Sequence, residues 1–406
     1  MRQLLRRRTE RTRTATGNAL PGHEPRASVD ELFDEAGRAR EQAGGDEHAA
    51  RPWTPLASGR MREEAERLAA RAFSQADAAD PAVHELRRWA QGRLARTLFD
   101  GRLAIAPPLP AEAPAAEDNP AVRVLGAAPS VAIAWDAVRR AVSSPLSDAR
   151  RVAAALAGRP ELERLVLAMA RGLGPAGREG REAGASVAGR AGVVRAVALC
   201  GFNDISALAL ASDLASGARA HGGDEGLLWL RSMIRGLLAR RVGLLAGRRM
   251  ERGGEWLFAS GLLLEAGALL AGRGAPASMA RAANLAAAEN IAPADAEASV
   301  FGAHLGELGG MVLGRLGAPA RLEQLLRLGP VPGAAPDDPG ALALHVADVL
   351  ARAACLPMDP AARVPALHPG SLEALGIDMP TLLPEAEAAH AHASGLAHLL
   401  RGFRAH

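Results

Sequence analysis

Residues 226–247 read Gly-Leu-Leu-Trp-Leu-Arg-Ser-Met-Ile-Arg-Gly-Leu-Leu-Ala-Arg-Arg-Val-Gly-Leu-Leu-Ala-Gly, and this stretch decides the fold class. Its large apolar side chains recur so that they cover one broad face of a helix: Leu227, Trp229, Leu230, Met233, Ile234, Leu237 and Leu238. Three arginines, Arg231, Arg235 and Arg240, lie mainly outside that face. The stretch therefore predicts a long helix that packs among other helices.

The same helical pattern continues on both sides of this stretch. It predicts helices at Met61–Phe73, Val83–Leu98, Asp148–Ala157, Glu161–Leu173, Val187–Cys200, Asp204–Ala218, Trp256–Leu270, Ser278–Asn290, Ala294–Leu316, Ala320–Leu328, Ala341–Ala354, Ser371–Leu375 and Pro384–Phe403. No stretch alternates convincingly as a strand would, and no fixed-period repeat stands out. The predicted fold class is all-α.

Local signals place the ends of several of these helices. Ser147 is a plausible N-cap for the helix that begins at Asp148. Pro160 falls in a first turn, where its missing N–H costs nothing, and Gly201 is a good residue to end a helix. Pro81 separates the first two helices.

The first 119 residues divide into two regions by composition. Residues 1–60 are polar and rich in Arg, so they predict a largely disordered region with a short helix near Val29–Gln42. Residues 61–119 predict short helices followed by a Pro/Ala linker. The linker begins near Ala106 and ends at about Pro120.

Composition excludes several kinds of chemistry. The chain has 406 residues with no Tyr, and its 48 basic residues are all Arg. Without lysine there is no P-loop, no pyridoxal phosphate Schiff base and no Ser-Lys hydrolase. A GC-rich genome explains the bias more simply than selection does. The two cysteines, Cys200 and Cys355, cannot build a disulfide framework and fit a reduced, cytoplasmic compartment.

Arginine clusters at the start of the chain, although the formal net charge is only +3. Six arginines fall in the first 13 residues: Arg2, Arg6, Arg7, Arg8, Arg11 and Arg13. We interpret them as a disordered basic tail. A tail that contacts an acidic partner or nucleic acid is the alternative.

The apolar stretch Trp256–Gly272 is the longest in the chain. A membrane span needs ~20 apolar residues without a charge. This stretch is shorter and contains Glu265. It predicts a buried core helix of a soluble protein, and no membrane span is expected.

Histidines in the last predicted helix offer one candidate metal site. Glu387 stands three residues before His390, a spacing that can put two ligands on one helix face. His392 and His398 lie on the same helix. Surface histidines on an alanine-rich helix are the simpler interpretation, so no metal is predicted here.

Two further pairs of polar residues are weak candidates. His304 and Glu307 lie in Phe301-Gly-Ala-His-Leu-Gly-Glu-Leu-Gly, whose glycines are more typical of close helix packing than of catalysis. His345 and Asp348 are three apart on a predicted helix and could pair, which is more often a local polar contact than a catalytic dyad.

Glycines recur between positions 172 and 192, but no strand precedes them, so they do not indicate a phosphate-binding loop. No serine lies in a Gly-x-Ser-x-Gly frame. From the residues alone, no active site emerges.

Residues 120–330 resemble the HDOD domain, a non-catalytic relative of the HD-type metal phosphohydrolases found in bacterial signalling proteins. Gly261-Leu-Leu-Leu-Glu-Ala-Gly-Ala-Leu resembles the family's GLLHDIGKL, and the stretch from Glu297 to Gly309 resembles its E...FG..HAELG. Looser similarities lie at 149–170, 193–210 and 316–319. The resemblance implies an HDOD-like helical domain at 120–330 and a C-terminal helical extension at 331–406.

The chain departs from the family at the positions that hold metal in the related hydrolases. The His-Asp pair falls on Leu264 and Glu265, and another histidine falls on Arg231. A later histidine falls on Leu305, with His304 displaced by one residue, or about 100° around a helix. Glu265 is expected to be either buried beside an arginine such as Arg231 or partly exposed.

The resemblance and its departures together imply a non-catalytic signalling module that acts through protein–protein contacts. We expect no enzyme activity, no cofactor and a protein partner of unknown identity, with nucleic acid unlikely as a partner. Two alternatives remain open. One is a diverged HD-type metal-dependent phosphohydrolase, and the other is a nucleic-acid or nucleotide binder that uses the Arg-rich N-terminus.

Overall fold

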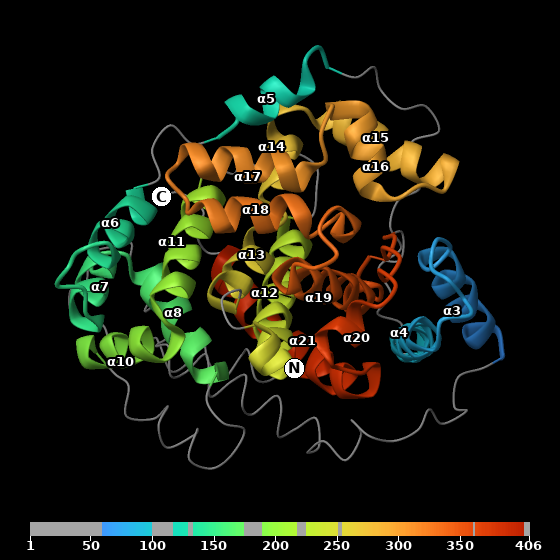
Figure 1. Cartoon of the computed structure of the whole chain (residues 1–406), viewed down its shortest axis with the longest axis horizontal. Helices are drawn as coiled ribbons and strands as arrows, with labels where there is room; N and C mark the ends of the chain where they lie inside the picture. The colour runs from blue at the N-terminus through green and yellow to red at the C-terminus, as the bar shows by residue number, and fades with distance from the viewer. Residues whose placement is uncertain are drawn as a thin grey trace, which may run out of the picture. The chain divides into compact units, whose positions relative to one another are not determined.

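The computed structural model describes residues 59–99, 117–128, 133–173, 189–216, 225–250, 254–359 and 362–401. Throughout these residues the regular elements are helices and there is no strand, so the predicted all-α class is confirmed (Figure 1). The predictions for residues 1–58, including the helix near Val29–Gln42, lie outside the described residues, as do most of the linker and the glycines from 174 to 184. The predicted domain boundaries stay predictions.

Helix α12 (Glu225–Ala246), the stretch that decided the fold class, lies among three other helices (Figure 1). It packs on α13 (Leu257–Leu263), α19 (Pro339–Cys355) and α21 (Met379–Arg401). The contact with α13 is close because a Cβ on Gly261 would lie 2.7 Å from the carbonyl oxygen of Arg235. Contacts this close align the backbones of α12 and α13 and position the polar residues described below.

The helices before α12 follow the predicted order, with two additions. α5 (Pro120–Gly126) and α6 (Ile133–Val142) were not predicted from the sequence. They are followed by α7 (Ala149–Leu156), α8 (Pro160–Leu173), α10 (Arg190–Cys200) and α11 (Phe202–Ser216). α10 ends at Gly201, whose φ of +92° suits glycine, and the chain bends there by 109° into α11.

The cap predicted at Ser147 is wrong by one residue. Asp148 is the N-cap of α7, and its carboxylate accepts a hydrogen bond from the N–H of Arg151 at 2.7 Å. Both residue types favour this position, so sequence alone does not choose between them.

The helical hairpin α3 (Gly59–Ala72) and α4 (Pro81–Phe99) packs on α19 and α21 through α4. Pro81, predicted as a separator, is the first residue of α4, where its missing N–H costs nothing. Arg93 of α4 pairs with Glu387 of α21 and donates to the carbonyl of Ala354 at the end of α19. The N-terminal hairpin is therefore tied to the C-terminal helices.

The single helix predicted at Trp256–Leu270 is wrong, because the chain breaks at Leu264 and Glu265. A short 3₁₀ turn η2 (Gly254–Trp256) leads into α13, and α14 (Ala266–Gly274) follows the break. Gly261 of α13 lies against α12, while Gly267 of α14 lies against the backbone of Leu305. The two halves thus contact different helices. The segment Gly254–Gly274 is apolar and long enough to cross a membrane, but 83% of its apolar 18-residue window is buried in the described structure.

The helix predicted at Ala294–Leu316 also breaks, at residues 302–304. It forms α16 (Pro293–Phe301) and α17 (Leu305–Arg315), with Gly302 at a φ of +80°. His304 caps α17 by accepting from the N–H of Glu307 at 3.2 Å. We call residues 302–304 the corner.

The remaining helices agree with the sequence to within a few residues. α15 (Pro276–Glu289) precedes α16, α18 (Ala320–Leu328) and α20 (Ser371–Leu375) have their predicted bounds, and a 3₁₀ turn η3 (Pro332–Ala334) leads to α19. α21 begins at Met379 rather than at Pro384, which lies inside the helix near its start.

Candidate functional site: a buried arginine–carboxylate cluster

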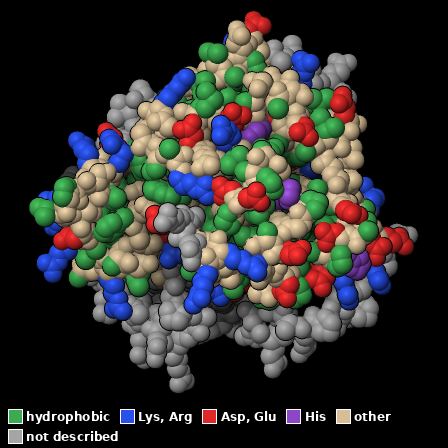
Figure 2. All heavy atoms as spheres, in the orientation of Figure 1, with side chains coloured by type: hydrophobic (Ala, Val, Ile, Leu, Met, Phe, Trp, Pro, Cys, Tyr) green, Lys and Arg blue, Asp and Glu red, His purple; other side chains and the backbone are tan. Residues whose placement is uncertain are grey.

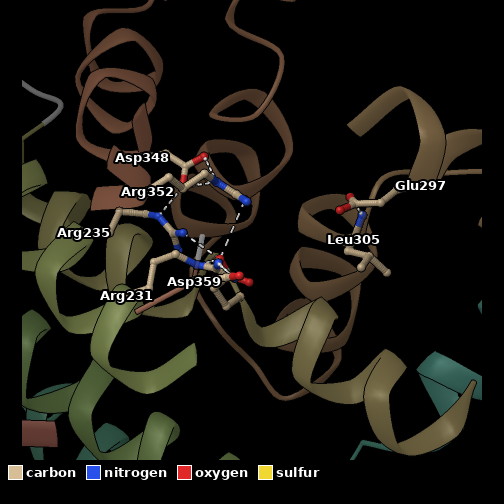
Figure 3. Close-up of polar contacts among 8 residues, drawn as sticks. Arg231, Arg235, Glu297, Leu305, Asp348, Arg352 and Asp359 are labelled. Carbon is tan, nitrogen blue, oxygen red and sulfur yellow. Dashed lines mark hydrogen bonds and ion pairs between the residues drawn. The ribbon is translucent and has the colours of Figure 1, made fainter. Parts of the chain in front are cut away.

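The helical core holds a group of four buried charged side chains, and a fifth, the partly exposed Arg352, joins them at its edge. α12 supplies Arg231 and Arg235, the break between α13 and α14 supplies Glu265, and α19 supplies Asp348 and Arg352. We call these five residues the cluster. Figure 3 shows Arg231 and Arg235 pointing from α12 toward Asp348 and Arg352 of α19. Residues that are far apart in sequence thus meet because α12 packs on both α13 and α19.

Glu265 lies at the centre of the cluster. Its Oε1 accepts from Nε of Arg231 at 2.8 Å and from Nη2 of Arg235 at 2.7 Å. Nη2 of Arg352 lies 3.7 Å from the same oxygen. One carboxylate oxygen therefore faces three guanidinium groups.

Asp348 is the second carboxylate. Its Oδ1 accepts from Nε of Arg235 at 2.6 Å, and its Oδ2 accepts from Nε of Arg352 at 3.0 Å. At the edge of the cluster, Nη1 of Arg231 lies 4.0 Å from Oδ2 of Asp359. Arg235 bridges both buried carboxylates and so joins α12 to α19 and to the break after α13.

Burial strengthens the interactions between these charges and shifts the pKa values of the two carboxylates. Arg235 is 0% exposed, Asp348 3% and Glu265 8%. Burial alone would raise the pKa of Glu265, but the guanidinium groups of Arg231, Arg235 and Arg352 outweigh it and hold that pKa well below its usual range. The pKa of Asp348 is lowered against the same cost of burial, chiefly by Arg235 and Arg352. Both carboxylates therefore stay ionised at neutral pH.

Some of the predicted site residues belong to the cluster, and others lie beside it. Arg231 and Glu265 pair with each other, which settles the choice left open for Glu265 in favour of burial. Leu264 and Leu305 are also buried and line a cavity beside the cluster. His304 does not face the cluster as a ligand would, because its Nδ1 accepts from the N–H of Glu307 and its ring also bonds the Arg327 carbonyl.

Sequence reasoning missed Arg235, Asp348 and Arg352 as members of the cluster. Asp348 was weighed only as a partner of His345, whose Nε2 instead lies 3.1 Å from the carbonyl of Ala366 and 3.1 Å from the backbone N of His368. A usable signal existed: Arg231 and Arg235 are one turn apart, and so are Asp348 and Arg352 in a largely apolar helix.

A cavity of about 60 Å³ adjoins the cluster, a volume that holds a few water molecules. Its polar walls are Glu265, Asp348 and Arg352 on one side and Glu297 of α16 on the other. Oε2 of Glu297 accepts from the N–H of Leu305 at 2.8 Å. Burial raises the pKa of Glu297 to about 7; Glu265 and Asp348 add to the rise, while the Leu305 N–H and Arg352 oppose it.

The histidines of α21 are not arranged as a metal site. Glu387 is engaged by Arg93 and by Nε1 of Trp89 at 3.1 Å. Burial, with Arg93 nearby, lowers the pKa of His390 to about 4. The side chain of His398 lies outside the described residues. Within the described part of the chain, no group of three or more His, Cys, Asp or Glu side chains is placed to hold a metal ion.

A second concave region, of about 620 Å³, lies where α10, α11 and the end of α12 meet. Asp204 lies in it and pairs with Arg240. Burial raises the pKa of Asp204 to about 7, against the opposing effect of Arg240. This region shares no residue with the cluster.

The region that supplies most of the cluster is also the region that matches a known family. Residues 190–328, from α10 to α18, match the family model of the HDOD domain. The chain contains an HDOD domain. The match includes Arg231, Arg235, Glu265 and Glu297, whereas Asp348 and Arg352 lie beyond it on α19. The match begins at residue 190, and the predicted start of the domain at 120 stays a prediction.

Two solved structures are similar to the chain. One is a "putative phosphohydrolase" from Shewanella amazonensis SB2B, with 18% identity and a TM-score of 0.49, covering 69% of this chain and 98% of the other. The second is an HDOD domain protein of unknown function from Geobacter sulfurreducens, with 17% identity and a TM-score of 0.45, covering 78% of this chain and 99% of the other. No curated protein sequence matches the chain.

Truncation of Leu264 is expected to destabilise the protein. This side chain is buried between the cluster and the cavity, so Leu264→Ala should destabilise the protein by about 2 kcal/mol, at the low end for a buried leucine because the adjoining cavity already limits its contacts. Urea denaturation followed by circular dichroism measures the change. Leu146→Ala, at a side chain that is 75% exposed, is the control and should change stability little. An equal loss in both variants would contradict the placement of Leu264.

Proposed function

We propose that the chain is a non-catalytic regulatory module that acts through contacts with a partner protein. One observation carries the proposal: Glu265, at a position where the resembling hydrolases carry a metal ligand, is neutralised by arginines of its own chain. The carboxylate then stabilises the fold instead of presenting a charge to a metal or a substrate.

The donor set at these positions does not fit a metal centre. Arg231 stands where a histidine ligand would stand, and a guanidinium has no lone pair to donate. Leu264 and Leu305 carry no ligand atom. The carboxylates that remain, Asp348 and Glu297, are bound to arginines in one case and to a backbone N–H in the other.

Electrostatics point the same way. Two unit charges 4 Å apart interact by roughly 4 kcal/mol at the effective dielectric of a protein surface, and more in the interior. A divalent ion in contact with Glu265 would lie near Arg231, Arg235 and Arg352 and be repelled by each of them. We therefore derive no metal-dependent step for this chain.

A partner would have to contact the surface of the helices. On the face drawn in Figure 2, apolar side chains lie interspersed with charged side chains of both signs, as on most protein surfaces. The large apolar side chains that are well exposed lie in different parts of the fold, and each can serve as a probe of one part of the surface: Val122, Leu146, Leu199, Leu244 and Met311.

The test combines affinity capture with metal analysis. The full chain and five single variants, each with glutamate at one of these exposed positions, are used to capture proteins from native host cells. We expect a stoichiometric partner that one or two of the variants lose while the others keep it and so serve as matched controls. A second capture without residues 1–58, which precede α3, shows whether the helical region alone suffices.

Two results would contradict the proposed function. Stoichiometric manganese or iron in the purified protein, with turnover of a cyclic dinucleotide, would overturn the proposal in favour of a diverged phosphohydrolase. Capture that is unchanged in all five variants and falls steeply with salt, but is lost without residues 1–20, would favour the Arg-rich N-terminus as a nucleic-acid binder.

A further inference from the structure

The charge of the chain is unevenly distributed. The described residues from Ile133 to Cys200 contain nine arginines and four carboxylates, which is a net charge of +5. Residues 254–401 contain eight arginines and fifteen carboxylates, which is a net charge of −7. The helices α6, α7, α8 and α10 are therefore strongly basic, although the formal net charge of the whole chain is only +3. A field of this kind orients a protein toward a partner of negative charge.

Three of these helices place their basic side chains on one edge of the helical region. α7 packs on both α6 and α10, and α11 packs on α6 and α10 from the inner side (Figure 1). The outward side carries five exposed arginines, which we call the basic face: Arg140, Arg150, Arg151, Arg190 and Arg195. Figure 2 shows basic side chains along this edge, whereas acidic side chains gather on the opposite side of the same view.

The charge of the basic face is not neutralised by ion pairs within the described residues. Two of its side chains bond neutral acceptors, which are the carbonyl of Asp136 and the hydroxyl of Ser144. The side chains of Arg150, Arg190 and Arg195 make no hydrogen bond or ion pair in the part of the chain that the structure describes. By contrast, the exposed arginines at the start of the helical region, on α3, pair with glutamates of the same helix. The basic face therefore keeps its charge available to a partner.

Two exposed leucines lie among these arginines. Leu199 follows Arg195 by four residues on α10, so the two side chains share a helix face, and Leu199 is 52% exposed. Leu146 is 75% exposed in the turn between α6 and α7, two residues after the Ser144 that Arg151 reaches. The basic face thus combines unpaired cations with apolar side chains that the fold leaves uncovered.

We propose that the basic face is a docking surface for a membrane whose lipids carry anionic head groups. Such a bilayer is broad enough to engage arginines from three helices at once, and each basic side chain near its surface raises affinity about five-fold. The negative charge of residues 254–401 turns the rest of the helical region away from the same surface. The chain would lie on the bilayer without crossing it.

The apolar side chains favour a membrane over nucleic acid. Leu146 and Leu199 can enter the boundary between head groups and acyl chains, whereas a phosphodiester backbone offers them no apolar contact. Stacking on bases is not available either, because Trp135, the one aromatic residue of α6, α7 and α10, is only 3% exposed.

Sedimentation of the full chain with lipid vesicles tests the proposal. Vesicles of equal parts phosphatidylglycerol and phosphatidylcholine should bind the chain at low salt and release it at high salt, and vesicles of phosphatidylcholine alone should not bind it. The triple variant Arg150→Gln, Arg190→Gln and Arg195→Gln should bind the anionic vesicles roughly a hundred-fold more weakly, at about five-fold for each charge.

A second triple variant is the matched control. Arg88→Gln, Arg281→Gln and Arg327→Gln replace arginines that are also exposed, on α4, α15 and α18, so the net charge is the same in both triple variants. The control should lose little affinity. Every substituted side chain is exposed, so both variants should fold, and circular dichroism checks this.

A leucine variant distinguishes the membrane from nucleic acid. Leu146→Ser combined with Leu199→Ser keeps every charge and should weaken binding to the anionic vesicles roughly ten-fold. Unchanged affinity would show that the leucines do not enter the bilayer and would overturn the proposal.

Two further results would overturn it. Equal losses in the two arginine variants would assign vesicle binding to the overall charge of the chain. Failure of the anionic vesicles to bind the full chain would exclude the membrane, and a short DNA duplex that binds through the same three arginines would then identify nucleic acid as the partner. The vesicles contain no protein, so these results do not depend on the proposed protein partner.

Discussion

Replacing Arg235 with methionine should cost the protein about 3–5 kcal/mol of its free energy of unfolding. Arg235 is fully buried and bridges Glu265 and Asp348, so its loss removes two charge-assisted hydrogen bonds, at 2.7 and 2.6 Å. Methionine restores much of the volume but none of the charge. The cost arises mainly because two buried carboxylates lose a partner that no solvent replaces. Chemical denaturation of the full chain near neutral pH measures it.

Arg241→Met is the matched control on the same helix. Arg241 pairs with Glu385 at 2.7 Å, a distance close to those of Arg235, but its side chain is 48% exposed. Water can solvate Glu385 once the arginine is gone, so the expected loss is below about 1 kcal/mol. Equal losses in the two variants would show that burial does not set the strength of the Arg235 pairs.

A double variant separates charge from packing. Arg235→Met combined with Asp348→Asn removes one of the two carboxylates that the single variant strands. It should recover part of the stability lost in Arg235→Met, because buried ion pairs replaced as a unit cost far less than pairs broken on one side. No recovery would indicate that shape, rather than charge compensation, is what Arg235 contributes.

The helices themselves could be predicted from the sequence because their signals are local. The apolar period at residues 226–247 is visible without knowing what covers it, and α18 and α20 have their predicted bounds. α5 and α6 were not predicted; α5 begins at Pro120, where the predicted Pro/Ala linker ends.

The two helix breaks could not be predicted in the same way. The apolar run through Leu264 continues the helical period without interruption, and what divides it is contact with other helices on both sides. At the corner, Gly302 was visible, but a single glycine inside a helical pattern is often tolerated. Tertiary packing therefore decided both breaks.

Only part of the cluster could be predicted from the sequence. Glu265 and Arg231 were singled out by their positions in a resembling family, and their pairing was one of two stated outcomes. Asp348 and Arg352 belong to α19, more than 80 residues later in the chain and beyond the stretch that matches the HDOD family model. Which buried charges meet depends on how α12 and α19 pack, and one sequence does not carry that information.

The second large effect is expected at Gly267, where alanine should destabilise the protein by about 3 kcal/mol or more. A Cβ at this position would lie 2.7 Å from the carbonyl carbon of Leu305 and closer still to its oxygen, and 3.1 Å from the N of Gly309. These are backbone atoms, so no side chain can rotate away and α14 would have to move from α17. The same movement would disturb the start of α17, where Glu297 and His304 bind.

Gly272→Ala is the matched control, because Gly272 belongs to the same helix and its Cβ would meet only the sulfur of Met279, at 3.8 Å. Alanine is favoured over glycine inside a helix by about 1 kcal/mol, so this variant should be unchanged or more stable. Thermal unfolding of the two variants beside the unmodified chain gives the comparison. If Gly267→Ala is also tolerated, the close approach of α14 to α17 is not required, and the break at Leu264 and Glu265 must be maintained by the cluster rather than by glycine packing.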